Sequence, residues 1–332
     1  MGIIKLKSRV GIRCVSSVCG KKEHDGPLGA LFTEFCEDDT FGMETFERAE
    51  AEMMRRCFAQ ALEKGRLGVS DIDAVFAGDL MDQCTASSYG LLQYDIPYFG
   101  LFGACSTMAE ALTLSALTVD GGYFRRAAAA SCSHNATAER QFRSPVEYGG
   151  QRTPTAQWTV TGAGCAVIER GDLPVFITEV LPGISVDRGV TDAANMGAAM
   201  APAAADTLVR YFRQSDTPPD GFDVILTGDL GEEGHSLARE LAALEGLELG
   251  ENFLDCGMLI YSKDQDVHSG GSGCGCSALG LAAYLFERFM KREIKSALLI
   301  GTGALMSPMA LAQGRSIPGI AHLLRLDRDP LV

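Results

Sequence analysis

The chain has 332 residues, of which 46% are hydrophobic, and its 43 acidic and 29 basic side chains give a formal net charge of −14. This length and hydrophobic content suffice for two ordinary domains, or for one large double-layered α/β unit, with a substantial core. The acidic balance argues against nucleic acid as a partner and against direct adhesion to anionic lipid.

The cysteines and the apolar runs indicate in which kind of cellular compartment the protein resides. Eleven cysteines without a regular spacing indicate free thiols in a reducing compartment rather than a disulfide framework. Residues 1–9 lack the apolar region of a secretion signal, and no uncharged apolar run reaches the ~18 residues that a membrane span needs. We therefore expect a soluble or peripheral protein that meets a membrane only through a protein partner.

The first half of the chain predicts an alternation of strands and helices. Residues 3–18 alternate as a strand does, and 24–40 are rich in glycine and acidic residues, as in an exposed excursion. A helix with one apolar face is predicted from Thr45 to Gly65. The elements expected after it are a strand at 71–80, a weak helix at 85–93, a strand at 96–102, an apolar helix at 106–119 and a strand at 126–132. This alternation favours parallel-dominated sheets with helices on both faces.

The second half repeats the order of the first. Asp73–Leu80 matches Asp223–Leu230 without a gap, so that Gly-Asp-Leu ends an apolar strand twice. Ala-Cys-Ser at 104–106 likewise pairs with Gly-Cys-Ser at 275–277, and an apolar helix follows each. The chain is therefore predicted to be an internal duplication, with an N-terminal half at 1–170 and a C-terminal half at 171–332.

Cys105 is the most informative single residue. It lies in Gly103-Ala-Cys-Ser-Thr107, directly before a helix in which Glu110 is the one charged residue as far as Val119. The N-terminus of a helix favours negative charge, so a thiol there is expected to lean toward the thiolate. The alternative is that Cys105 is a small buried hydrophobe, as many free cysteines are.

Two α/β halves with a cysteine at the start of a buried central helix resemble the thiolase superfamily. This resemblance implies a thiolase-like five-layered α-β-α-β-α fold from two duplicated halves, usually dimeric, with the pocket where the halves meet. In that superfamily the helix-tip cysteine carries an acyl group, a role that would fall to Cys105.

Acyl transfer at Cys105 would also need a base to move protons. Where the superfamily has Gly-His-Pro or Gly-Asn-Thr, this chain has Gly-Cys-Gly-Cys at 273–276, and Gly-Asp at 228–229 replaces another synthase histidine. His134 and His235 are candidate substitutes, although each also fits a hydrogen-bonded loop histidine. The alternative to a binding protein is therefore an active ketoacyl synthase or thiolase-like acyltransferase that uses Cys105 with an unusual base such as His134.

Longer runs resemble one non-catalytic branch of this superfamily, the stage V sporulation protein AD family of spore-forming bacteria. The runs that carry the resemblance are Ala77–Leu80, Gly100–Thr107, Ser133–Arg143, Glu147–Gln151, Thr155–Gly164, Asn195–Asp206 and Gly270–Ser277. The resemblance implies a protein that binds dipicolinic acid (pyridine-2,6-dicarboxylate), free or as its calcium chelate, and is not an enzyme. No cofactor is implied, and calcium enters only as part of the ligand.

The same resemblance implies partners and a place in the cell. These are a homodimer, and membrane channel proteins of the stage V sporulation A operon with which the protein loads dipicolinic acid into the developing spore. The protein would then be cytoplasmic and peripherally associated with the forespore inner membrane through those partners. No separate metal site is expected, because Cys274-x-Cys276 has no second pair at the spacing of structural zinc sites.

The family's pocket involves positions that correspond to Asp79 and Cys105. Helix N-termini at Cys105 and Cys276, with the N–H groups of the 269–277 loop, would receive the carboxylates of a planar dianion, and Arg140 and Arg143 would add bidentate positive charge. Asp79 would orient donors or meet calcium in the ligand, whereas a cap for a helix or loop is its structural alternative. The predicted ligand-binding residues are Asp79, Cys105, Ser106, His134, Asn135, Arg140, Cys274 and Cys276.

Overall fold

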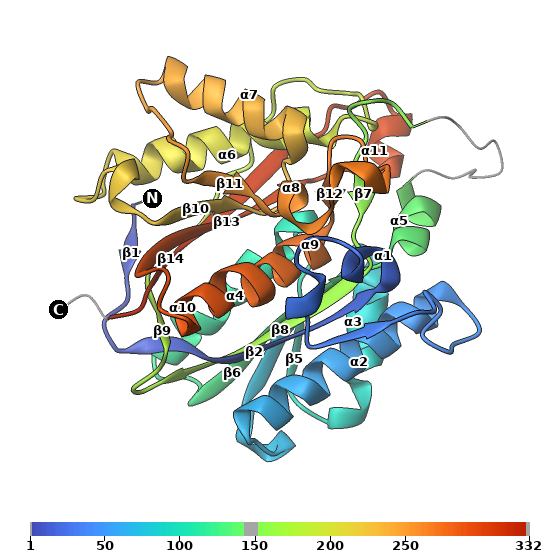
Figure 1. Ribbon diagram of the computed structural model, residues 1–332, viewed down its shortest axis with the longest axis vertical. Helices are drawn as coiled ribbons and strands as arrows, with labels where there is room; N and C mark the ends of the chain where they lie inside the picture. Colours follow the sequence, from blue (N-terminus) through green and yellow to red (C-terminus); the bar gives the residue numbers. More distant parts are fainter. Residues whose placement is uncertain (1, 143–151, 330–332) are drawn as a thin grey trace.

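The computed structural model describes residues 2–142 and 152–329, which form a 12-stranded sheet and a two-stranded sheet with helices on both faces (Figure 1). The strands are β1 (Ile4–Lys5), β2 (Val10–Gly20), β3 (Glu34–Cys36), β4 (Ala74–Gly78), β5 (Tyr98–Gly100), β6 (Arg126–Ser133), β7 (Trp158–Thr159), β8 (Gly162–Arg170), β9 (Val175–Leu181), β10 (Val224–Thr227), β11 (Phe253–Asp255), β12 (Gly271–Ser272), β13 (Ser296–Ala304) and β14 (Gly319–Asp327). The helices are α1 (Lys21–His24), α2 (Phe46–Gly65), α3 (Thr85–Leu91), α4 (Thr107–Asp120), α5 (Asn135–Phe142), α6 (Met196–Phe212), α7 (Gly231–Leu244), α8 (Cys256–Ile260), α9 (Cys274–Leu279), α10 (Glu287–Met290) and α11 (Pro308–Ala312). A 3₁₀ turn, η5 (Ala104–Ser106), precedes α4, and a π-helical segment, η9 (Gly280–Phe286), joins α9 to α10.

The local signals in the sequence place most of these elements. Helix α2 begins where the pattern predicts, because the Thr45 hydroxyl accepts the Arg48 backbone N–H at 3.3 Å and so caps the first turn. The left-handed residue that ends α2 is Arg66, with φ at +51°, rather than Gly65. Gly65 instead leaves room for the sulfur of Cys14, which lies 3.0 Å from where a Cβ would stand.

The strand order confirms the duplicated architecture. The first half of the sheet runs β5-β4-β6-β8-β2 and the second runs β11-β10-β13-β14-β9, which is the same order of corresponding strands. In each half the three outer strands pair in parallel, the fourth (β8 or β14) is antiparallel to both of its neighbours, and the fifth (β2 or β9) again runs with the outer three. Four of these five strands therefore run in one direction, as the alternation of strands and helices predicts, although half of the pairings among the five are antiparallel. A short pairing of β2 with β9 at Gly11 and Ile12 joins the halves into one sheet. The division into domains at 1–170 and 171–332 stays a prediction.

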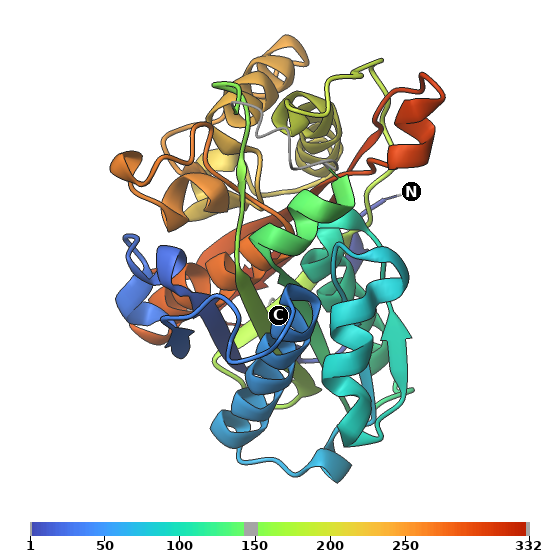
Figure 2. The ribbon, with the colours of Figure 1, turned by 90° about the vertical axis from the view of Figure 1, so that its right-hand side faces the viewer.

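Five layers result from this arrangement. Helices α2 and α3 pack on the outer face of the first half of the sheet, and α6, with α7 against it, packs on the outer face of the second. Helix α4 and the continuous helix α9-η9-α10 lie between the two halves (Figure 1). In Figure 2 the green helix α5 stands between the lower α2 layer and the upper α6 and α7 layer.

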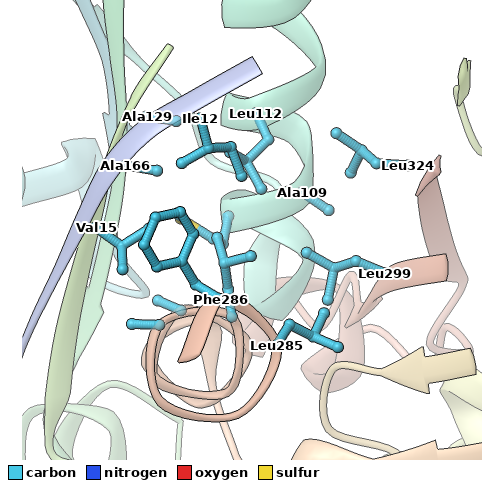
Figure 3. Close-up of a cluster of buried hydrophobic side chains, with 14 of the residues drawn as sticks. Ile12, Val15, Ala109, Leu112, Ala129, Ala166, Leu285, Phe286, Leu299 and Leu324 are labelled. Atoms are coloured by element: carbon cyan, nitrogen blue, oxygen red, sulfur yellow. The ribbon is translucent and has the colours of Figure 1, made fainter. Parts of the chain in front are cut away.

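The central layer is held by apolar side chains from both halves. Figure 3 shows Ile12 of β2, Leu112 of α4, Phe286 of η9 and Leu299 of β13 in one cluster, and each of the four has an exposed fraction of 8% or less. Full burial of such a side chain contributes about 1.5–3 kcal/mol to the free energy of folding. Helix α4, which follows Cys105, and helix α9, which carries Cys274 and Cys276, are therefore fixed side by side. In the described residues no helix is both long and apolar enough to cross a bilayer.

Candidate functional site

Cys105 lies at the sharp turn between β5 and α4. Ala104, the residue before it, has φ at +52°, a left-handed conformation that costs energy for a residue with a Cβ. The Ser106 hydroxyl donates to the Gly103 carbonyl at 2.7 Å and the Thr107 hydroxyl donates to the Ala104 carbonyl, so local bonds hold the turn. The turn leaves Cys105 with an exposed fraction of 5% at the wall of a cavity.

This cavity has a volume of about 220 Å³. It lies between segments of both halves, and α5, which contributes to it, faces the viewer in Figure 2. Its wall is mostly apolar, with hydroxyl groups and one carboxylate among the described side chains. The residues that line it are Leu80, Phe102, Ala104, Cys105, Ala138, Glu139, Phe142, Thr159, Met196, Ser272, Ala304, Leu305, Met306 and Ser307.

A buried carboxylate, Asp229, lies directly behind this wall. The Ser272 hydroxyl donates to Asp229 Oδ2 at 3.1 Å, and the Gly273 backbone N–H donates to the same oxygen at 2.9 Å. The Thr302 hydroxyl donates to Oδ1 at 2.7 Å, and the Cys105 thiol lies 3.9 Å from the same Ser272 hydroxyl. The wall at Cys105 and Ser272 is therefore backed by an acceptor that already holds several donors.

This arrangement changes the expected ionisation of Cys105. Burial raises the pKa of the thiol well above its ordinary value, and the negative charge of Asp229 raises it further. The prediction that Cys105 leans toward the thiolate is therefore wrong. The helix N-terminus is outweighed because its stabilising field acts on a group that has lost its water and faces a carboxylate.

A side chain of the protein itself, Asp229, binds the N-terminus of α9. Gly273 has φ at +98°, and a Cβ built there would stand 2.8 Å from the Ser133 hydroxyl, so only glycine fits. Its N–H is the group that binds Asp229. The expected seat for a ligand carboxylate at this helix is thus filled by the protein's own side chain.

Asp79 does not line the cavity. It is fully buried, and its Oδ1 accepts the Met81 N–H at 3.0 Å while Oδ2 accepts the N–H and the hydroxyl of Ser87 at 2.8 and 2.7 Å. These bonds fix the loop that carries Leu80, which does line the cavity. The structure therefore places Asp79 in the capping role, one residue away from the wall.

The histidines considered as bases are tied to the backbone. His134 Nε2 lies 2.8 Å from the Asp39 carbonyl oxygen and its Nδ1 accepts the Ala136 N–H at 3.1 Å, which makes Nε2 the protonated nitrogen. Burial lowers the pKa of His134 and of His235, whose Nε2 lies 3.0 Å from the Phe253 carbonyl oxygen. Neither ring lines the cavity, so the pairing of Cys105 with His134 or His235 as base is wrong in this structure.

The other predicted site residues lie outside the wall. Asn135 begins α5 and donates its N–H to the Thr161 hydroxyl at 3.2 Å, whereas Arg140 is 59% exposed and paired with Glu47 on a different surface. The expectation that Arg140 faces the Cys105 pocket is wrong, because α5 presents Ala138, Glu139 and Phe142 to it instead. Arg143 lies outside the described residues.

One residue of η5 and two cysteines of α9 are also buried and are not among the residues that line the cavity. The Ser106 hydroxyl donates to the Gly103 carbonyl, and the Cys274 thiol donates to the Cys132 carbonyl at 2.9 Å behind the wall. Cys276 is fully buried in the central core. None of the three is among the lining residues, so the structure does not support direct contact of these side chains with a ligand there.

Sequence reasoning missed most of the wall. Ser272 and Thr159 belong to runs that carry the family resemblance, so their motifs offered a signal. Phe102 and Met196 also lie in such runs, whereas Met306 lies outside them and offered no signal, because an apolar residue in a loop looks like ordinary core. Tertiary packing brings them to one place.

Solved structures show the class of fold. A 3-oxoacyl-[acyl-carrier-protein] synthase III from Aquifex aeolicus VF5 has a TM-score of 0.58 at 13% identity and covers 95% of this chain and 99% of that one. The synthase III from Pseudomonas aeruginosa PAO1 has a TM-score of 0.58 at 12% identity, covering 98% and 99%, and the tetronic acid condensing enzyme AbyA1 has 0.59 at 17%, covering 96% and 99%. The chain is therefore a thiolase-fold protein of the ketoacyl synthase type in architecture.

Sequence comparison defines the family within this class. The family model described as stage V sporulation protein AD matches residues 2–327. The stage V sporulation protein AD of Bacillus subtilis (strain 168) is 41% identical over 317 residues, which cover 96% of this chain and 94% of that protein. The chain belongs to the stage V sporulation protein AD family, which confirms the resemblance seen in the sequence.

Proposed function

We propose that this chain is a non-catalytic thiolase-fold protein that binds dipicolinic acid, free or as its calcium chelate, in the Cys105 cavity. The observation that carries the proposal is a cavity of about 220 Å³ at the strained cysteine turn, with both candidate histidine bases bound elsewhere. Its volume is below the roughly 300–1,000 Å³ of pockets for drug-sized ligands, so it suits a ligand with one ring. Membership of a sporulation family supports this choice of ligand.

The wall has the chemistry of a site for a planar aromatic acid. Phe102 and Phe142 offer ring faces for stacking, and the Met196 and Met306 side chains adapt to the ligand outline. The hydroxyls of Thr159, Ser272 and Ser307 offer polar contacts at the same wall. Apolar sides with a few polar groups are typical of small-molecule sites.

The charges around the cavity bear on the form of the ligand. Glu139 lines it and Asp229 lies behind its wall, and the lining residues that the structure describes include no lysine, arginine or histidine. A dianion is repelled by these two carboxylates, whereas a chelate that brings its own calcium is repelled less. This favours the calcium chelate over the free dianion.

The partners that the resemblance implies belong to the same proposal. A homodimer would use the edge strand β5, whose outer side is unpaired among the described strands and carries Phe99 with an exposed fraction of 46%. Leu92 and Tyr89, exposed by 72% and 70%, precede this strand. We further infer that the protein meets the forespore inner membrane through channel proteins of its operon.

Calorimetry tests the binding half of the proposal. Dipicolinate is titrated with and without calcium into the wild type and into Cys105→Ala and Ser272→Ala, with Cys36→Ala as a control away from the cavity. Saturable binding that Ser272→Ala weakens about 2- to 10-fold, the equivalent of one hydrogen bond, is expected. Absence of saturable binding in the wild type with either form of the ligand overturns the proposal.

Mass spectrometry tests the non-catalytic half. The wild type is incubated with acyl-CoA and the peptide that contains Cys105 is searched for an acyl adduct. A protein that only binds leaves this peptide unmodified. An adduct that forms at Cys105 and turns over would show that the protein is an acyltransferase.

A further inference from the structure

The repeated Gly-Asp-Leu motif places two buried carboxylates in different surroundings. Asp79 and Asp229 both follow the end of a corresponding strand, and both have an exposed fraction of 0%. Asp79 binds donors of its own loop, from Met81 to Ser87. Asp229 instead accepts hydrogen bonds from two distant segments, the loop at Ser272 and Gly273 and the strand β13 at Thr302. Asp79, the corresponding residue of the first half, is therefore a natural control for the effect of Asp229 on Cys105.

A chain of polar groups connects the thiol to this carboxylate. Cys105 Sγ lies 3.9 Å from Ser272 Oγ, and Ser272 Oγ lies 3.1 Å from Asp229 Oδ2. Gly273 and Thr302 bring two more donors, and the Thr302 hydroxyl is free to donate because its oxygen accepts the Asp229 N–H at 3.0 Å. Burial raises the pKa of Asp229, whereas the hydrogen bonds from Thr302, Gly273 and Ser272 lower it. Because each of these groups donates, the ionised carboxylate is the form that satisfies them.

We propose that Asp229 is a positioning residue that keeps the Cys105 thiol protonated and non-nucleophilic, by holding a negative charge behind the Ser272 hydroxyl that the thiol contacts. This inference rests on the non-catalytic part of the proposed function and gives it a cause. A thiol is a nucleophile only as the thiolate. Asp229 thus lowers the nucleophilicity of Cys105, which the fold places at the tip of a helix.

Other titratable groups lie around Cys105 and Asp229. Cys274 and Cys276 approach it from α9, and Glu139 of α5 lines the same cavity. Asp255 accepts the backbone N–H groups of Leu230 and Gly231, next to Asp229 in the chain. Among the described lining residues none is cationic. Burial raises the pKa of the thiol as well, and that contribution remains when Asp229 is changed.

Alkylation of the ligand-free full chain measures this effect. The rate of iodoacetamide addition to the Cys105 peptide is followed by mass spectrometry from pH 6 to 10 in the wild type and in Asp229→Asn. Removal of an adjacent charge shifts a pKa by about 1–3 units. Each unit gives about tenfold more thiolate, which is intrinsically about threefold less nucleophilic. We therefore expect Asp229→Asn to raise the rate at pH 8 by about 3- to 30-fold and to lower the midpoint of the pH profile.

Two control variants separate charge from loosened structure. Asp79→Asn removes the corresponding carboxylate of the first half, and Thr302→Val removes a donor to Asp229 but keeps its charge. Neither is expected to speed alkylation of Cys105 or to lower its midpoint. Equal acceleration in Thr302→Val and Asp229→Asn, or an unchanged midpoint in Asp229→Asn, overturns the inference.

A measurement on the wild type alone keeps the inference testable if Asp229→Asn fails to fold. Its Cys105 midpoint must lie above the ~8.5 of a free thiol, and a lower value refutes this role of Asp229. This outcome differs from failure of the proposed function, which shows as no binding of dipicolinate or as turnover of acyl-CoA.

Discussion

Glu50 gives the sharpest stability prediction of this fold. It lies on α2 with an exposed fraction of 0%, where its Oε2 accepts the Thr137 hydroxyl at 2.6 Å and its Oε1 lies 3.5 Å from Cys132 Sγ. None of the ion pairs among the described residues includes it. Burial, and then the neighbouring Asp79, raise the pKa of Glu50 from 4.5 to about 8.

The raised pKa fixes the sign of the pH dependence. The folded protein holds a proton on Glu50 that the unfolded chain releases above its ordinary pKa of 4.5, so the stability from this group is complete below 4.5 and is lost as the pH rises through about 8. A shift of this size corresponds to an amount on the order of 4 kcal/mol. In Glu50→Gln, which is neutral at every pH, this dependence disappears.

Urea unfolding followed by circular dichroism from pH 5 to 8.5 tests this prediction. Other groups that titrate in the window, such as Glu23 with a pKa raised to about 7, cancel in the difference between variant and wild type. Glu50→Gln is expected to gain stability relative to the wild type by up to on the order of 4 kcal/mol across this range. Glu52→Gln is the matched control, because its arginine partners lower the pKa of Glu52 and leave a flat difference above pH 5. A flat difference for Glu50→Gln would refute the reasoning.

Three further predictions concern other parts of the molecule. Burial lowers the pKa of His322 from 6.5 to about 4, so the wild type loses stability as the pH falls from 6.5 toward 4. The loss is about 2 kcal/mol after allowance for the partial exposure of the ring. His322→Asn is expected to remove this loss when urea unfolding at pH 4.5 is compared with unfolding at pH 7. Asp79→Arg places an unpaired cation in a fully buried site and is expected to destabilise the fold by about 3 kcal/mol or more, whereas Asp79→Asn costs about 1–3 kcal/mol. A thermal melt of Asp79→Arg equal to that of the wild type would contradict the capping role. Phe99→Asp at the edge strand β5 is expected to shift the mass in light scattering from dimer to monomer, and a dimer that persists rules out this edge as the interface.

The sequence by itself determined the architecture of this protein. The gapless match of Asp73–Leu80 with Asp223–Leu230 predicts the duplication, because corresponding strands of a repeat must end at corresponding places in the fold. The apolar helix after Cys105 predicts the central layer, since a helix without a polar face must be covered on most sides. Motif runs spread over nearly the whole chain also identified the family.

Only the tertiary structure decided which side chains meet at the cavity and in what ionisation state. Leu80, Phe142 and Ser272 are brought together from both halves by packing, and no local pattern records that distance. The ionisation of Cys105 depends on burial and on Asp229, which lies more than a hundred positions away in the chain, so the helix-tip argument alone gave the wrong direction. Local rules describe the field of one helix, whereas a pKa responds to every charge and every lost water around the group.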